Sequence, residues 1–254
     1  MTSHLALLTG VLIVSAIGSR DARAQQTPSF EGVTIVFRVS GPDWEKTATH
    51  YYTASKVSFD QGDAATVVDL ATGRIVMMSM TKKQYSETTF VEIEQAMTSV
   101  SAQMEKAMAG IPEGLRKKMM GDAERDVALT KGDIRTVASV SCQNYVVALG
   151  EKTRMETCAA LAFDPPFDRA HLRNLALVTA PIAKGHSGLN KMVEKLREIP
   201  GLSLASSMTL SLMGRKIETS TEATQIRRGP IDGAHFEIPQ DFQKIDSPFA
   251  KMAR

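Results

Sequence analysis

The sequence predicts an α+β protein: a strongly curved antiparallel sheet, a half-barrel of about 10–12 strands, with helices packed on its concave face. Two observations predict this fold. Short runs in which apolar and polar residues alternate recur along most of the 254 residues, separated by turns rich in Gly, Pro and Lys. Amphipathic helical segments interrupt these runs twice. Because a sheet of so many sequential strands has to curl, the helices are most simply placed inside the curve.

The N-terminal 24 residues are typical of a secretory signal peptide. Leu5 to Ile17 are mostly apolar, too few to span a bilayer, and Ala22-Arg23-Ala24 supplies small residues for cleavage after Ala24. An uncleaved anchor is the alternative. We therefore expect a periplasmic mature protein, residues 25–254, that forms one domain and has no transmembrane segment. Cleavage lowers the formal charge from +2 to +1, because Arg20, Asp21 and Arg23 are lost, and this balance argues against nucleic acid as a partner.

The first half of the mature chain is expected to form a meander of strands. Val33, Ile35, Phe37 and Val39 alternate with polar residues, which is typical of a half-buried strand. In the next run we expect Tyr51, Thr53, Val57 and Phe59 to share one face. Turn residues punctuate the segment. The expected strands are 33–39, 48–59, 64–70, 74–80 and 84–88.

The segment 89–110 is predicted to be the long helix against which the sheet packs. Thr89 and Glu92 have the spacing of a capping box, and Gly110 followed by Pro112 ends the helix. Apolar residues recur at steps of three and four along one face. This stripe consists of Ile93, Ala96, Met97, Val100, Met104, Ala107, Met108 and Ile111.

The second half repeats the alternation of helices and strands. A short helix at 112–120 precedes four strands at 126–131, 134–139, 142–149 and 153–163, with hairpin turns at Gly132-Asp133 and after Leu149. Pro165 and Pro166 then break the sheet. Two further helices are expected at 167–178 and 189–199, with a loop between them at 180–188. Three more strands, at 204–213, 216–228 and 234–245, complete the expected order.

The two cysteines, Cys142 and Cys158, lie on opposite sides of the expected turn at Gly150, so they face each other on paired strands. An exported protein meets oxidising conditions, and we expect a structural disulfide. A redox or metal pair is the alternative, but that use needs closer spacing or neighbouring His ligands.

The remaining reactive side chains do not form a catalytic or metal-binding pattern. Fourteen methionines suggest either an adaptable apolar lining or ordinary core, and Met78 and Met80 alone share a strand face suitable for copper. We predict no metal, no cofactor and no enzymatic activity. The isolated histidines, His50, His171, His186 and His235, are expected on the surface or in turns.

Four short segments give the chain a resemblance to known proteins: Thr66 to Leu70, Lys83 to Glu87, Cys142 to Tyr145, and Phe236 to Ile245. In this order they resemble an uncharacterised group of secreted bacterial proteins and, more distantly, the LolA/LppX-like superfamily of envelope proteins. The resemblance implies a half-barrel whose helices cover an apolar cavity, and better understood members carry lipoproteins or lipids. No catalytic residue is implied.

The resulting expectation is non-catalytic binding of a lipid, acyl chain or other hydrophobic molecule between sheet and helices. Apolar side chains from both layers would line the space. The alternative is a packed envelope protein without a ligand, which recruits a protein partner through exposed strands or the loop at 180–188. The expected lining residues are Phe59, Met78, Met80, Ile93, Met97, Val100, Met104, Met108, Met192 and Leu196.

Overall fold

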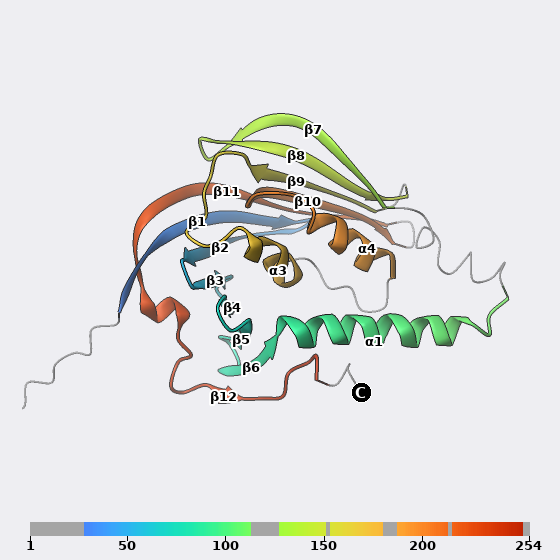
Figure 1. Ribbon diagram of the computed structural model, residues 1–254, viewed down its shortest axis with the longest axis horizontal. Helices are drawn as coiled ribbons and strands as arrows, with labels where there is room; N and C mark the ends of the chain where they lie inside the picture. The colour runs from blue at the N-terminus through green and yellow to red at the C-terminus, as the bar shows by residue number, and fades with distance from the viewer. Residues whose placement is uncertain (1–27, 113–126, 151–152, 180–186, 213–214, 251–254) are drawn as a thin grey trace, which may run out of the picture.

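The computed structural model describes residues 28–112, 127–150, 153–179, 187–212 and 215–250. The expected signal peptide and most of the expected helix at 112–120 and loop at 180–188 lie outside these ranges. The described residues form a mostly-β structure with twelve strands in one sheet (Figure 1). The strands are β1 (Ser29–Gly41), β2 (Trp44–Thr53), β3 (Lys56–Asp60), β4 (Ala64–Asp69), β5 (Arg74–Ser79), β6 (Gln84–Thr89), β7 (Val127–Val137), β8 (Val140–Leu149), β9 (Thr153–Ala160), β10 (Ser203–Leu212), β11 (Arg215–Asp232) and β12 (Gln243–Lys244).

The strands lie in the order β12-β6-β5-β4-β3-β2-β1-β11-β10-β9-β8-β7. All pairs are antiparallel except β12 with β6, so the sheet is mixed. The central pair joins the two halves of the chain, because β1 bonds to both β2 and β11. The sheet is neither closed nor strongly curled, which differs from the expected half-barrel. Twist spread over many strands lets an open sheet cover its helices without closing.

Three α-helices are described, α1 (Phe90–Met108), α3 (Ala170–Thr179) and α4 (Ser187–Leu196), together with the 3-10 helix η2 (Gly233–Phe236). In Figure 1, α3 and α4 lie between the β7–β11 part of the sheet and α1. The packing agrees with this view: α4 contacts β7 and β8, and α3 contacts both α1 and α4. The helices therefore cover one face of the sheet, as the sequence predicts.

Helix α1 begins where the capping box predicts. The Thr89 hydroxyl accepts a hydrogen bond from the Glu92 backbone N–H at 3.2 Å, and the Glu92 carboxylate accepts one from the Thr89 N–H at 2.9 Å. Ile93 and Ala96 are buried in the main core. The predicted N-terminus and apolar stripe are thus confirmed over the first turns of the helix.

The sheet has an apolar core on each face. The main core, on the helical face, combines residues such as Val57 and Phe59 of β3 with Leu175 of α3. A second cluster on the opposite face includes Val67 and Met78 and is completed by Phe236 of η2. Neighbours such as Val67 and Val68 belong to different clusters, because successive strand residues point to opposite faces.

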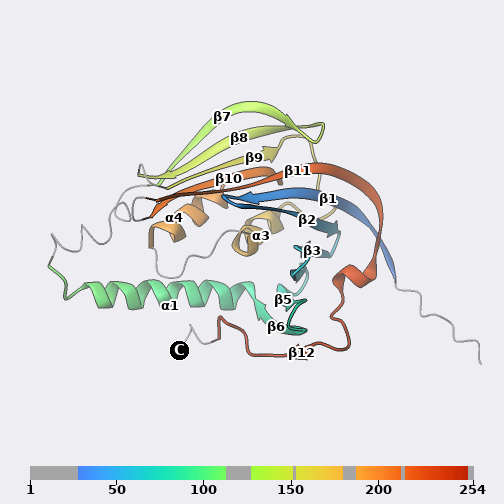
Figure 2. The ribbon, with the colours of Figure 1, turned by 180° about the vertical axis from the view of Figure 1, so that it is seen from behind.

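The C-terminal segment after η2 covers part of this second cluster. It runs along β6 (Figure 2), where β12 pairs in parallel with Gln84 and Tyr85. Lys244 forms an ion pair with Glu87 at 2.6 Å, and Lys83 pairs with Asp241 at 2.8 Å. The single strand expected at 234–245 is therefore wrong: the segment is a 3-10 turn, an extended stretch with Pro239, and a two-residue strand.

Two other strand boundaries differ from the prediction. The run 48–59 is broken after Thr53, whose hydroxyl oxygen accepts a hydrogen bond from the Lys56 N–H at 2.9 Å. As a result Tyr51 packs on the opposite face from Phe59, not on the same face. In β7 the expected turn at residues 132–133 is a bulge within one strand. The hairpin instead turns at Ala138 and Ser139, both with positive φ.

The predicted disulfide between Cys142 and Cys158 is confirmed. The two Cα atoms are 5.3 Å apart on the neighbouring strands β8 and β9. Both residues are fully buried in the main core. The bond therefore cross-links the two strands of the β8–β9 hairpin within the main core.

Candidate functional site

A cavity of about 310 Å³ lies between the helical face of the sheet and the helices α3 and α4. Strands β1 to β4 supply one part of its wall and β9 to β11 another. Leu172, Leu175 and Ala176 of α3, which recur at helical spacing, line this space. Secondary structure from both halves of the chain thus forms the wall of this cavity, which is partly open.

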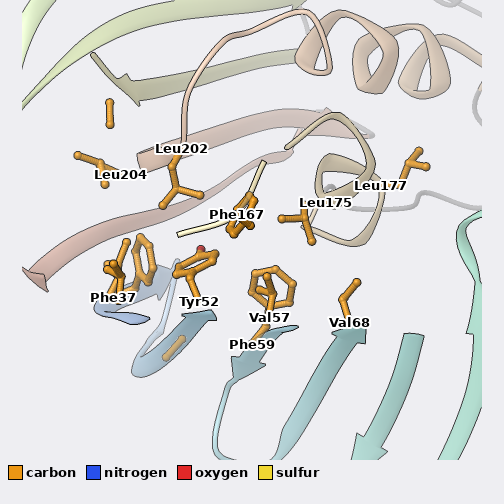
Figure 3. Packing of buried hydrophobic residues seen from close by; sticks show 14 of the residues in the cluster. Phe37, Tyr52, Val57, Phe59, Val68, Phe167, Leu175, Leu177, Leu202 and Leu204 are labelled. Atoms are coloured by element: carbon orange, nitrogen blue, oxygen red, sulfur yellow. The ribbon is translucent and has the colours of Figure 1, made fainter. Parts of the chain in front are cut away.

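Most of the lining side chains are apolar. Figure 3 shows Tyr52 and Phe59 reaching from the strands toward Phe167 and Leu175 on the helical side. The rings of Tyr52 and Phe167 are 6.0 Å apart. The full lining is Phe37, Val39, Ala48, His50, Tyr52, Phe59, Gln61, Thr66, Met155, Thr157, Ala159, Leu172, Leu175, Ala176, Val178, Leu196, Arg197, Ile199, Gly201, Leu202, Ser203, Ala205, Ser206 and Thr221.

One hydrogen-bonded polar pair, His50 and Tyr52, stands among the aromatic side chains of the wall. The His50 Nδ1 atom lies 3.1 Å from the Tyr52 hydroxyl oxygen. The imidazole ring also contacts two phenyl rings, with centroid distances of 4.4 Å to Phe37 and 4.7 Å to Phe59. Both residues lie on β2, where the alternation of a strand places Ala48, His50 and Tyr52 on the same face.

Burial keeps this pair uncharged at neutral pH. It lowers the pKa of His50 from 6.5 to about 3, because the imidazolium form loses its hydration among the phenyl rings. It also raises the pKa of the Tyr52 hydroxyl, since burial disfavours the phenolate. His50 is therefore a very weak base, and the pair provides hydrogen-bonding groups without a charge.

A charged residue, Arg197, also forms part of the cavity wall, where the chain leaves α4. Its side chain is only 9% exposed. The guanidinium group donates to the carboxylate of Glu194 at 2.9 Å and to that of Glu94, on α1, at 3.0 Å. Arg197 thereby ties α1 to α4 beside the cavity.

The residues predicted to line a ligand site separate into several groups in the structure. Phe59 and Leu196 line the cavity. Ile93 is buried in the main core and Met97 packs against it, whereas Val100 is half-buried on α1. Met78 and Met80 belong to the cluster on the opposite face, and Met192 packs with Val147 and Leu149. The side chains of Met104 and Met108 lie outside the described set, and ligand contact by any of these residues stays a prediction.

The expectation that His50 lies on the surface or in a turn is wrong. Its ring is half-buried and forms part of the cavity wall. The signal that could have placed it was the alternation of Ala48, His50 and Tyr52. The prediction instead places Tyr51 and Thr53 on the same face as Phe59. A single continuous strand from residue 48 to residue 59 requires that register.

No cluster of three or more His, Cys, Asp or Glu side chains suited to holding a metal ion occurs among the described residues. Over the same ranges, no helix has the length and apolar character needed to cross a membrane.

The fold and cavity define a mostly-β protein with one open twelve-stranded sheet and a largely apolar pocket under two short helices. No protein-family model matches the sequence, and no curated protein does. Similar solved structures include an uncharacterized conserved protein from Thermus thermophilus, with 11% identity and a TM-score of 0.43 over 85% of this chain and 90% of that one. MucB in the Pseudomonas aeruginosa MucA/MucB complex has 10% sequence identity and a TM-score of 0.39, over 85% of this chain and 58% of that one. A LolA superfamily protein from Nitrosomonas europaea has 8% sequence identity and a TM-score of 0.25, over 84% of this chain and 92% of that one.

Proposed function

We propose that the protein binds a hydrophobic small molecule, such as a lipid or acyl chain, without catalysis, in the cavity under α3 and α4. The observation that carries this proposal is the partly open cavity of about 310 Å³ with a mostly apolar lining. Sites for small ligands span roughly 300–1,000 Å³, so the volume suits one compact ligand or part of a longer chain. Each buried methylene group would contribute about 0.8 kcal/mol to binding.

The polar groups of the wall support binding more than catalysis. A histidine with a pKa of about 3 is almost entirely neutral at pH 7 and accepts a proton weakly, so His50 is poorly suited to general-base chemistry. His50 and Tyr52 instead supply hydrogen-bonding groups that orient a ligand. Arg197 adds a donor-rich group at another part of the wall.

We place the function in the cell envelope, with residues 25–254 as a single exported domain. The buried disulfide between Cys142 and Cys158 supports an oxidising compartment. The apolar N-terminal segment from Leu5 to Ile17 supports export. Such a protein would hold its ligand away from water between membranes or surfaces.

The test is to identify what the protein carries when it is made in a bacterial cell with its full sequence. The purified protein is extracted with organic solvent and the extract is analysed by mass spectrometry, with an unrelated exported protein as a control. We expect a stoichiometric apolar compound that is absent from the control. A protein that yields no such compound, and acquires none after incubation with envelope lipids, would favour the packed interaction protein instead.

A further inference from the structure

Three hydroxyl-bearing residues form a row across the cavity wall on neighbouring strands. Ser206 of β10 lies directly opposite Thr157 of β9 and Thr221 of β11. Residues directly opposite each other in an antiparallel sheet point to the same face, with Cβ atoms about 4.5–5.5 Å apart. All three residues line the cavity. Their side chains therefore lie side by side on the cavity face of the sheet, and we call them the hydroxyl row.

The hydroxyl row has hydrogen-bonding capacity that the protein leaves unused. The Ser203 hydroxyl donates to the Ala205 carbonyl oxygen at 3.2 Å, so the Thr157 hydroxyl is the donor in its 2.8 Å contact with Ser203. The Thr157 oxygen keeps its capacity to accept. The hydroxyl groups of Ser206 and Thr221 have no hydrogen-bond partner within the part of the chain that the structure describes. Both residues are half-buried, and each can donate to a ligand and accept from it.

The neighbouring part of the wall is apolar and more deeply buried. Thr221 lies directly opposite Val39 of β1, and Phe37 follows on the same face, about 7 Å along the strand. Phe37 and Phe59 are only 3% and 6% exposed. The polarity of the wall thus changes from the half-buried hydroxyl row to a buried aromatic region. This arrangement suits a ligand with a polar end and an apolar chain.

The polar groups on the opposite part of the wall are uncharged. His50 and Tyr52 bond to each other through the 3.1 Å contact of their side chains. The carboxamide oxygen of Gln61 accepts a hydrogen bond from Lys46 at 3.2 Å, and Thr66 adds one more hydroxyl group on β4. These groups can bond to a neutral ligand but give no charge to recognise an anion.

The positive charges at the wall are compensated. Among the described residues that line the cavity, Arg197 alone is charged at pH 7, and its guanidinium donates to the carboxylates of Glu194 and Glu94. Lys46, beside Gln61, forms an ion pair of 3.7 Å with Asp63. A carboxylate ligand would lose hydration in the cavity without meeting an uncompensated positive charge. An uncharged polar end avoids this cost.

We infer that the cavity binds uncharged amphiphiles with a polyol head, such as monoacylglycerols, with the head at the hydroxyl row and the acyl chain against Phe37 and Phe59. This inference rests on the proposed function and specifies its ligand class. A glycerol ester has two hydroxyl groups, which both donate and accept hydrogen bonds, as Ser206 and Thr221 do. Its acyl chain matches the apolar part of the wall.

The experiment measures by calorimetry the binding of 1-monodecanoylglycerol and methyl decanoate to the full chain at pH 7. The two esters share the decanoyl chain and differ in the glycerol hydroxyl groups. In Ser206→Ala/Thr221→Val two hydroxyl groups of the row are removed with little change of shape. We expect this variant to bind monodecanoylglycerol about tenfold more weakly and methyl decanoate as the wild type does.

The matched control is Ser207→Ala, which removes a hydroxyl group from the same strand at the next position, on the opposite face. It should change neither affinity. A loss of monodecanoylglycerol affinity in Ser206→Ala/Thr221→Val that is absent, or no larger than the loss for methyl decanoate, would overturn the inference.

The wild-type protein alone tests the preference for an uncharged head. We expect decanoate to bind at least tenfold more weakly than monodecanoylglycerol at pH 7, because its carboxylate loses hydration without a free cation to meet. Equal or tighter binding of decanoate would contradict the inference, whatever the variants show.

The outcomes separate this inference from the proposed function. Binding of methyl decanoate supports an apolar binding cavity whether or not the hydroxyl row contributes. If methyl decanoate binds and monodecanoylglycerol binds no more tightly, only the ligand class is overturned. The absence of binding by all three probes overturns both.

Discussion

The Nδ1 atom of His50 lies 3.1 Å from the hydroxyl oxygen of Tyr52, two residues along the same strand. Both residues lie in the cavity wall, where the neutral imidazole is surrounded largely by apolar side chains. Its consequence for stability depends on pH, because the pKa of His50 is lowered from 6.5 to about 3 in the folded protein.

The first prediction is a loss of stability in mild acid. Between about pH 6.5 and pH 3 the unfolded protein binds a proton at His50 that the folded protein does not, so the free energy of unfolding decreases as the pH falls through this window. At about pH 5 the expected loss is of the order of 2 kcal/mol. Urea unfolding at pH 7, 6 and 5 measures it.

Two variants assign this pH dependence to His50. His50→Gln removes the titrating group and should flatten the dependence between pH 6.5 and 5. Tyr52→Phe keeps the imidazole buried, so it should retain the dependence while losing about 1 kcal/mol of stability from the hydrogen bond. An equally steep dependence in His50→Gln would show that another group is responsible.

The second prediction concerns the cavity volume. Ala176 faces the cavity from α3, so Ala176→Phe places a ring in the space that a ligand would occupy. We expect methyl decanoate affinity to fall at least tenfold, as measured by calorimetry. Ala170 is exposed on the same helix, and Ala170→Phe is the matched control with an expected affinity close to wild type. Equal affinities in the two variants would place binding elsewhere.

The third prediction tests the capping box of α1. Thr89→Ala removes the hydroxyl acceptor for the Glu92 N–H and should destabilise the protein by about 1 kcal/mol. Thr98 is exposed within the same helix, where its hydroxyl donates to the Glu94 carbonyl. Thr98→Ala should be neutral or slightly stabilising, because Ala favours helix interiors. Thermal unfolding of both variants distinguishes capping from a general effect of threonine removal.

The fourth prediction concerns the disulfide. Cys142 and Cys158 are separated by 16 positions, and closing a loop of this size contributes about 3 kcal/mol in the chain-entropy description. Cys142→Ala/Cys158→Ala should lower the free energy of unfolding by about this amount under oxidising conditions. Wild-type protein unfolded with a reducing agent should approach the variant. A variant as stable as oxidised wild type would contradict a structural role.

Local sequence signals predicted the features that depend on neighbouring residues. Thr89 and Glu92 specify the start of α1 by a contact three residues apart. Cys142 and Cys158 were predicted to pair because a short turn brings their strands together. Such features could be predicted because they depend on contacts between residues close in the sequence, and hardly on the packing of distant segments.

Features set by the register between distant segments could not be predicted in this way. The break after Thr53 reverses the faces of the strand, which moves His50 into the cavity wall and Tyr51 to the opposite face. Met78 belongs to the same cluster as Phe236 of η2, and no local pattern indicates this grouping. The position of the Arg197 guanidinium is set only when α1 brings Glu94 beside Glu194 of α4.

The most direct measurement is a crystal structure of the full chain with a methyl decanoate analogue that carries bromine at the end of its acyl chain. We expect the anomalous bromine signal inside the cavity, near Phe37, Leu175 or Leu202. A bromine signal only outside this cavity, or none at saturating ligand, would contradict binding between the sheet and helices α3 and α4.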